Sequence, residues 1–223
     1  MKRNVILTVL CAALILAAQS LSAQHLLLKA GGGFAKQFGE SKPVGAYKIG
    51  LGYEYEFDQH WTLTPSLLLY GKGWKAPDVQ VQVVDDATGE PVFDDEGNAV
   101  MSTKSVSSAA NYVEVPLILS YYFRTGEDRY IVLGAGPYAA VGVAGKTKTK
   151  GDGQRIGSEK LFYKENTFEN GARRFDAGVQ AYGGYQFPSG LVLGIEADFG
   201  LVRFRAGGER NLSAIISLAY RFD

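Results

Sequence analysis

Residues 111–123, NYVEVPLILSYYF, alternate between two faces when they are set out as a β-strand. One face is wholly apolar or aromatic and consists of Val113, Val115, Leu117, Leu119, Tyr121 and Phe123. The other face is mixed and places a carboxylate, Glu114, in mid-strand. An apolar face opposed to a mixed face is typical of a strand between lipid and the filled interior of a barrel. Pro116 has no N–H to donate, so we expect a bulge or weakened pairing beside it.

The same two-residue period recurs in other segments of the chain. These are residues 25–34, 44–57, 61–72, 130–143, 174–187, 191–204 and 211–222. Their connections alternate between long and short, and the longest are polar stretches at 73–108 and 144–172. The first of these contains VQVQVV, PVF and AVM, which we expect to pair as short strands beyond the membrane. The sequence therefore predicts an all-β fold, an eight-stranded antiparallel up-and-down transmembrane β-barrel with extended extracellular loops.

The N-terminal residues 1–23 have the pattern of a cleaved signal peptide. Lys2 and Arg3 precede an apolar run, and small residues end at Ala23, so residues 24–223 would form the barrel domain. The run is shorter than the roughly 20 apolar residues of a spanning helix. Cys11 is the single cysteine and lies inside this run, so the mature chain would have neither disulfides nor Cys-ligated metals. Loss of the leader leaves 21 basic against 23 acidic residues, a balance that does not favour nucleic-acid binding.

Ionisable residues fall on the mixed faces of the expected strands. They are Lys48, Glu54, Glu56, Glu114, Asp176, Glu196, Asp198 and Arg221. The interior of an eight-stranded barrel is only wide enough to be filled by side chains, and an isolated buried ion is very costly. We therefore expect a charge network in the lumen. Because acids outnumber bases in this set, tyrosines, water or further bases such as Lys29 and Lys72 would have to complete it.

The segments YVEVPLILSYYF, RFDAGVQAYGGYQF and SLAYRFD resemble the PorT-like family of outer-membrane β-barrel domains from Bacteroidetes-type bacteria. The resemblance covers the mature chain and is strongest at residues 112–117. It implies an eight-stranded barrel in the cell outer membrane, and no single biochemical activity. Tyr220 and Phe222 keep the spacing of a barrel-assembly signal, although Asp223 follows the last aromatic residue.

Catalytic and metal-binding chemistry has little support in the sequence. His25 and His60 remain after the leader is removed, and neither is expected beside a serine and an acid, so we expect no enzyme. Pairs of carboxylates such as Glu54 with Glu56 fit a salt-bridge network better than acid–base catalysis. An acidic cluster could hold a divalent cation, but its spacing is not that of an EF-hand loop and a solvated turn is the simpler interpretation. The cluster comprises Asp85, Asp86, Asp94, Asp95 and Glu96.

A run of alternating lysines offers a possible contact with lipid. Lys146, Lys148 and Lys150 would lie on one side of an extended segment, where they could meet lipopolysaccharide phosphates or simply be solvated. The partners we expect are outer-membrane lipid and lipopolysaccharide, the barrel-insertion machinery and an extracellular partner of the loops, without a cofactor.

The sequence thus favours an integral outer-membrane protein, a non-enzymatic scaffold whose extracellular loops serve surface binding or adhesion. Two alternatives stay open. One is a narrow pore or a component of an outer-membrane transport or secretion system. The other is a soluble lipocalin-like ligand binder, in which the apolar faces would point inward.

Overall fold

The computed structural model describes residues 24–85, 87–153, 162–169 and 171–222, so the signal peptide expected at 1–23 lies outside the described residues. The strands are β1 (Gln24–Gln37), β2 (Val44–Glu56), β3 (Trp61–Lys75), β4 (Val79–Gln82), β5 (Met101–Gly126), β6 (Arg129–Lys150), β7 (Phe162–Asn166), β8 (Phe175–Gln186), β9 (Leu191–Arg203) and β10 (Arg210–Phe222). Within the described ranges, no helix is both long enough and apolar enough to cross a membrane.

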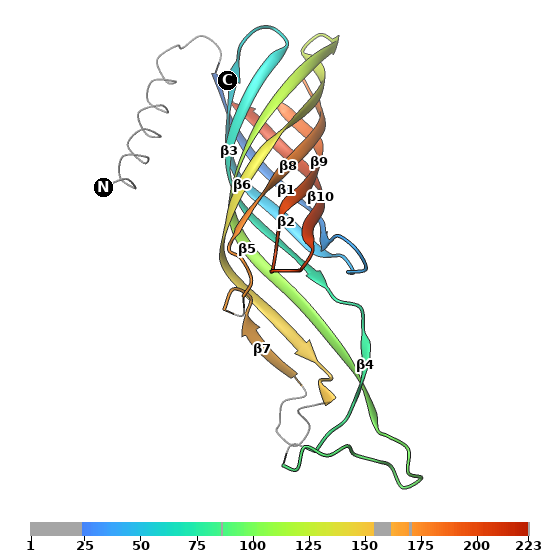
Figure 1. Cartoon of the computed structure of the whole chain (residues 1–223). Coiled ribbons are helices and arrows are strands. Elements are labelled where there is room, and N and C mark those ends of the chain that lie inside the picture. The colour runs from blue at the N-terminus through green and yellow to red at the C-terminus, as the bar shows by residue number, and fades with distance from the viewer. Residues whose placement is uncertain (1–23, 86, 154–161, 170, 223) are drawn as a thin grey trace, which may run out of the picture.

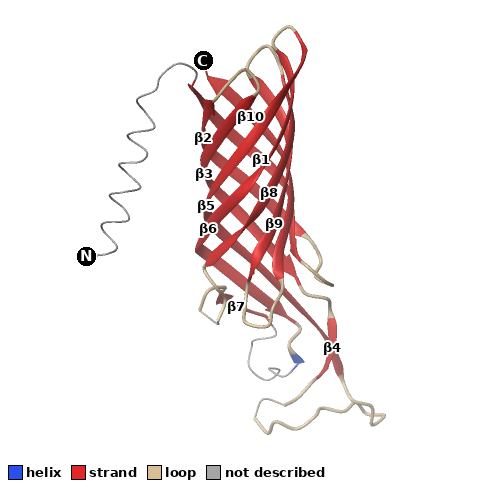
Figure 2. Cartoon of the chain, turned by 45° about the horizontal axis from the view of Figure 1, so that its top comes forward, coloured by secondary structure: helices blue, strands red, loops and turns tan. Residues whose placement is uncertain are grey.

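Eight of these strands close into a ring. Their order is β5-β3-β2-β1-β10-β9-β8-β6, and β6 pairs back onto β5. All the pairings are antiparallel, and Figures 1 and 2 show the strongly tilted strands wrapping around a cylinder. The short strands β4 and β7 add to the outer ends of β5 and β6. The expected eight-stranded antiparallel barrel is therefore confirmed.

The apolar row of each strand faces outward and the mixed row faces inward. Leu117, Ile195 and Leu218 are 40%, 63% and 52% exposed, whereas Glu114 and Glu196 are 0% exposed. Outward apolar side chains need hydrocarbon around them, because such a continuous surface would be unstable in water. The soluble lipocalin-like alternative is wrong, since it requires the opposite orientation.

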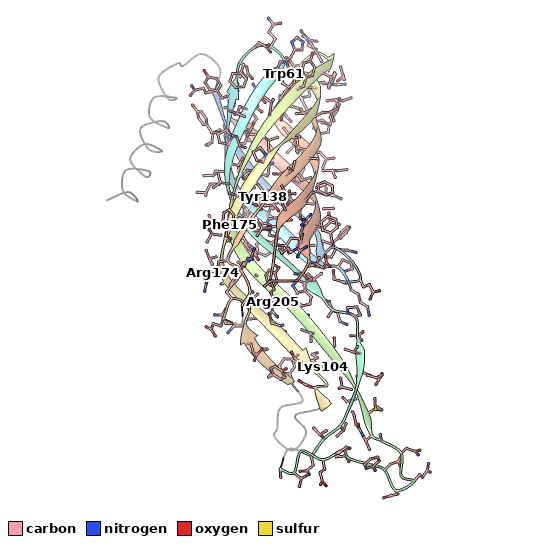
Figure 3. The ribbon with its side chains drawn as sticks, in the orientation of Figure 1. Trp61, Lys104, Tyr138, Arg174, Phe175 and Arg205 are labelled. Atoms are coloured by element: carbon pink, nitrogen blue, oxygen red, sulfur yellow. The ribbon has the colours of Figure 1, made fainter. Side chains whose placement is uncertain are left out.

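The two ends of the barrel differ. One end, here called the turn end, holds the start of β1, the end of β10 and the short connections β2–β3, β5–β6 and β8–β9. Aromatic side chains pack on its outer face, for example Trp61 against Tyr121 at 5.0 Å between ring centroids and Tyr220 against Phe222 at 4.8 Å. Figure 3 shows Trp61 at this end. Such a girdle is typical of a membrane–water interface.

The opposite end, here called the loop end, carries a projecting sheet that the sequence placed partly in loops. β5 begins at Met101 rather than near residue 111, and β6 continues to Lys150 rather than ending near residue 143. Residues 101–106 of β5 lie beyond its pairing with β3, and residues 144–150 of β6 lie beyond its pairing with β8. Here β5 pairs with β4 and β6, and β6 pairs with β7. We call this sheet, in the order β4-β5-β6-β7, the extension (Figure 1). Backbone pairing outweighs the polar composition of these segments.

Pairing is interrupted beside Pro116, as expected. β3 pairs with β5 at Leu117 and again at Glu114, but Val115 and Pro116 between them have no partner in the register. The proline has no N–H, so that ladder position cannot be filled. On the other side of β5, a side chain at Gly136 of β6 would meet the carbonyl oxygen of Leu117, so a glycine lets the two strands approach there.

Candidate functional site

The middle of the barrel is filled by ions centred on Lys48. Its ammonium lies 2.8 Å from Asp198, 3.1 Å from Glu114 and 3.3 Å from Glu196, and its side chain is 0% exposed. The partners come from strands β5 and β9, neither of which pairs with β2, so the cluster ties non-adjacent strands together. Charges buried this deeply are tolerated only when they are paired.

Two more lysines extend this central cluster. Lys72 lies 2.7 Å from Asp176 and 3.6 Å from Glu114, and Lys29 lies 2.9 Å from Glu196. These two residues supply bases that the eight sequence candidates lacked. The central cluster therefore sets three ammonium groups, of Lys29, Lys48 and Lys72, against four carboxylates, of Glu114, Asp176, Glu196 and Asp198.

Tyrosine rings fill the space around the lysines. The ammonium of Lys48 is 4.4 Å from the ring centroid of Tyr70, and that of Lys72 is 4.8 Å from Tyr112 and 5.1 Å from Tyr138. A cation over an aromatic face is favourable, more so when water is excluded. Tyr138 appears within the lumen in Figure 3.

The remaining sequence candidates form a second cluster near the turn end. Arg221 lies 3.3 Å from Glu54 and 2.9 Å from Glu56, and the hydroxyl of Tyr122 donates to Glu54. A cavity of about 600 Å³, lined by residues such as Glu56, Tyr122 and Arg221, opens at this end. A second cavity, which shares Tyr122 with it and reaches Lys29, holds only about 30 Å³, so the opening is a blind mouth.

The loop end of the lumen is covered by aromatic side chains that the sequence did not identify. Phe168, in the stretch after β7, is 8% exposed and packs edge-on against Tyr112 at 5.9 Å between centroids. Phe204, between β9 and β10, is 6% exposed and packs against Trp74 at 6.4 Å. The sequence signal for these cap residues was a single aromatic residue, Phe168 or Phe204, within an otherwise polar connection. We call Phe168, Phe204 and Trp74 the aromatic cap.

Both histidines lie near the turn end, away from any nucleophile arrangement in the described residues. The Nε2 atom of His25 is 3.5 Å from Glu56, within the second cluster. The ring of His60 stacks on that of Tyr121 at 5.4 Å between centroids. Tyr220 and Phe222, the proposed assembly signal, are each 43% exposed on the outer face.

The far tip of the extension is acidic. Residues 76–103 contain seven acidic residues and no lysine or arginine. Asp85 accepts hydrogen bonds from the backbone N–H groups of Ala87 and Thr88, and Asp94 accepts from those of Glu96 and Asn98. These bonds lower the pKa of both carboxyl groups and keep them charged. Thus both carboxylates also organise turns.

The structure does not gather these acids into a metal site. Among the described residues, no group of three or more His, Cys, Asp or Glu side chains is placed to hold a metal ion. Asp86, a member of the candidate cluster, lies outside the described residues. Asp95 and Glu96 are exposed beside the turn that Asp94 closes.

A family model matches most of the chain. The family model described as outer membrane protein beta-barrel domain matches residues 18–204. No curated protein matches the chain. The crystal structure of Ail, the attachment invasion locus protein of Yersinia pestis, is 16% identical with a TM-score of 0.41, and the match covers 89% of this chain and 97% of that one.

A second similar structure is the N-terminal β-barrel domain of Pseudomonas aeruginosa OprF. It is 12% identical with a TM-score of 0.39, and the match covers 90% of this chain and 100% of that one. At these identities and scores, what the two proteins do does not transfer to this chain.

Proposed function

This chain belongs to the outer membrane protein beta-barrel domain family, and we propose that its barrel is an inert anchor that displays the extension for binding at the cell surface. The barrel lies in the outer membrane, and the binding role rests on two properties of the structure. The lumen is filled, so the barrel offers little room for transport. The longest strands, β5 and β6, continue past the barrel and form a projecting sheet.

The proposal rests on one observation: the lumen of the barrel is filled, and a charged tip projects beyond its loop end. Side chains of the central cluster are 0–4% exposed except that of Lys29, at 13%. On the loop-end side of this cluster, the aromatic cap covers the lumen. A barrel with a filled and covered lumen can anchor the chain in the membrane, but it has no open passage for a solute.

The acidic tip is the part of the extension that best fits a partner. Residues 85–98 carry exposed carboxylates such as Glu90, Asp95 and Glu96, and no base lies among them to neutralise their charge. Complementary charge steers association and contributes specificity. We therefore infer that the partner presents a basic surface, and that adhesion to such a surface is the work of this protein.

The topology can be tested on intact cells with a protease that cuts after glutamate. Cleavage at Glu96, with Glu114 and Glu196 protected, is expected if the extension is displayed outside; Glu90 is followed by Pro91 and is not a cleavage site. Absence of cleavage on intact cells, with cleavage after the outer membrane is opened, would place the extension in the periplasm and overturn the proposal.

Binding can be tested with the chain in lipid nanodiscs and a fluorescent oligolysine peptide as the basic probe. The variant Glu90→Gln/Asp95→Asn/Glu96→Gln should bind less tightly, and added salt should weaken binding to the unchanged chain. These residues avoid Asp85 and Asp94, which hold the turns. Equal affinities for the variant and the unchanged chain would count against the acidic tip as the binding surface.

A narrow pore, or a component of a transport or secretion system, is the second candidate. The blind mouth at the turn end favours it, since a cavity of about 600 Å³ could admit a small solute or a segment of another protein. Single-channel recording in planar bilayers separates the two functions. We expect no steady current, and a clear open state would favour the pore.

Finer assignments belong to the same proposal. The segments that resemble PorT-like barrels support membership of that branch in Bacteroidetes-type bacteria. The pattern of residues 1–23 supports export through a cleaved signal peptide. Tyr220 and Phe222 support recognition by the barrel-insertion machinery, because they end the last strand and face outward. The placement of His25 and His60 supports a non-enzymatic role.

A further inference from the structure

Four lysines lie together on the outward face of the extension, close to the barrel. They are Lys146, Lys148 and Lys150 of β6 and Lys164 of β7, here called the lysine face, and all four are exposed. We propose that the lysine face binds phosphate groups on the headgroups of lipids in the outer leaflet, and so fixes the height and orientation of the extension. This inference goes beyond the function of the acidic tip and does not depend on what that tip binds.

A bulge in β6 turns these lysines outward. Gly142 pairs with Tyr112 and Ala144 pairs with Asn111, which leaves Val143 as an extra residue. Val143 and Ala144 are both exposed, so the side-chain alternation shifts by one at this point. Beyond it, Thr147 and Thr149 face the buried side, at 8% and 4% exposure, and the lysines face outward.

Among the described residues, the acid beside this face is Glu169, which accepts a hydrogen bond from Asn166 opposite Lys146 and is not in an ion pair with a lysine. Lys148 lies directly opposite Lys164 in the β6–β7 register, and like charges in that position are destabilising. No ion pair joins any of the four to a carboxylate within the described parts of the chain. Glu165 lies opposite the buried Thr147, on the other face.

Two other lysines at the loop end have carboxylate partners. Lys104 of β5 lies 3.1 Å from Asp152, and Lys42 lies 2.9 Å from Asp78. The extension therefore uses carboxylates where a lysine needs a partner inside the protein. The ammonium groups of Lys150 and Lys164 lie 5.7 Å and 5.4 Å from the ring centroid of Phe162, and an external anion would relieve the repulsion between Lys148 and Lys164.

The part of the lysine face nearest the barrel lies within side-chain reach of the lipid headgroup layer. The apolar outward row of β6 ends at Val143, which is 51% exposed. A strand rises about 3.3 Å per residue and is tilted by about 40°, so Lys146 stands about 8 Å above Val143 and Lys150 about 18 Å. The headgroup layer begins at the edge of the hydrocarbon and is about 5–7 Å thick. Lysine side chains can bend back along their stems to reach that layer.

Basic residues recur around the same end of the barrel, whereas the turn end has aromatic rings. Exposed Arg203 and Arg210 face each other across β9 and β10, and exposed Arg173 precedes β8. Figure 3 shows Arg174 next to Phe175, at the level where the barrel gives way to the extension. The guanidinium of Arg174 packs over Phe168 at 4.9 Å and donates to the carbonyl of Gly142. These arginines add positive charge around the loop end, beside the lysine face.

The experiment uses the full chain in detergent, with purified lipopolysaccharide as the probe and the same lipid after enzymatic removal of its phosphates. The variant Lys148→Gln/Lys164→Gln removes the opposed pair. The matched control, Arg124→Gln/Arg129→Gln, removes two exposed charges at the turn end. A basic residue near an anionic surface contributes about 1 kcal/mol, so the lysine variant should bind the phosphorylated lipid about 25-fold more weakly and the control should be unchanged.

Three further readouts keep the proposal falsifiable. Without lipid, the lysine variant should resist unfolding at least as well as the unchanged chain, because it loses a repulsion. Lys148→Arg/Lys164→Arg should bind normally, because it keeps the charge. Equal binding of phosphorylated and dephosphorylated lipid, or of the lysine variant and the control, would overturn the proposal. Complete competition by equimolar inorganic phosphate would overturn the assignment to a lipid headgroup.

Discussion

Replacement of Lys48 by methionine tests whether the central cluster holds the barrel together. Methionine keeps most of the side-chain volume and removes the charge. Glu196 then keeps Lys29 at 2.9 Å and Glu114 keeps Lys72 at 3.6 Å, but Asp198 is left with a hydrogen bond from Ser213 at 3.1 Å. A buried carboxylate that loses its charge partner typically costs about 3–5 kcal/mol. We expect the free energy of unfolding to fall by that amount.

The assay is equilibrium unfolding by guanidinium in lipid vesicles, followed by the fluorescence of the two tryptophans. Arg129→Met is the control, because its side chain is exposed at the turn end and has no carboxylate partner among the described residues, and it should change stability by less than about 0.5 kcal/mol. The second change Asp198→Asn, added to Lys48→Met, should restore part of the loss, since it removes the unpaired charge. A loss below about 1 kcal/mol for Lys48→Met, the level of an exposed pair, would refute the reasoning.

Three other changes follow from the geometry. Gly136→Ala should destabilise the barrel by about 1–3 kcal/mol, because the new methyl group meets the Leu117 carbonyl oxygen, whereas Gly45→Ala, which has open space, should not; the same unfolding assay compares them. The hydrogen bond from Lys42, and to a lesser extent those from Ser105 and Lys75, lower the pKa of Asp78 to about 2. The contribution of this carboxylate to stability is therefore fully present above about pH 4 and is lost as the pH falls towards 2. A carboxyl NMR titration should show that value, and Lys42→Gln should raise it. Phe168→Ala opens the aromatic cap but should leave single-channel current at background, because the central cluster still fills the lumen; a steady current would show that the cap alone closes the barrel.

The alternation of side chains determined most of this fold. A strand in a closed barrel has a lipid side and a lumen side, so apolar positions recur at every second residue. Residues 113–123 show this alternation directly. The same period placed Lys48, Glu114 and Glu196 on the inner wall. It could not say that Lys48 touches three carboxylates, because the register between strands, rather than the pattern within one, sets those distances.

Tertiary structure decided what the period does not encode. The polar residues of the extension have no apolar row to mark them as strand. Backbone pairing of residues 105–111 with 144–150, and of residues 101–104 with β4, made them so. Phe168 became a cap because its loop folds over the lumen. The direction of Lys146, Lys148 and Lys150 depended on one extra residue, Val143. If the alternation that starts at Ile131 ran unbroken along β6, these lysines would face the lumen, but the bulge at Val143 turns them outward.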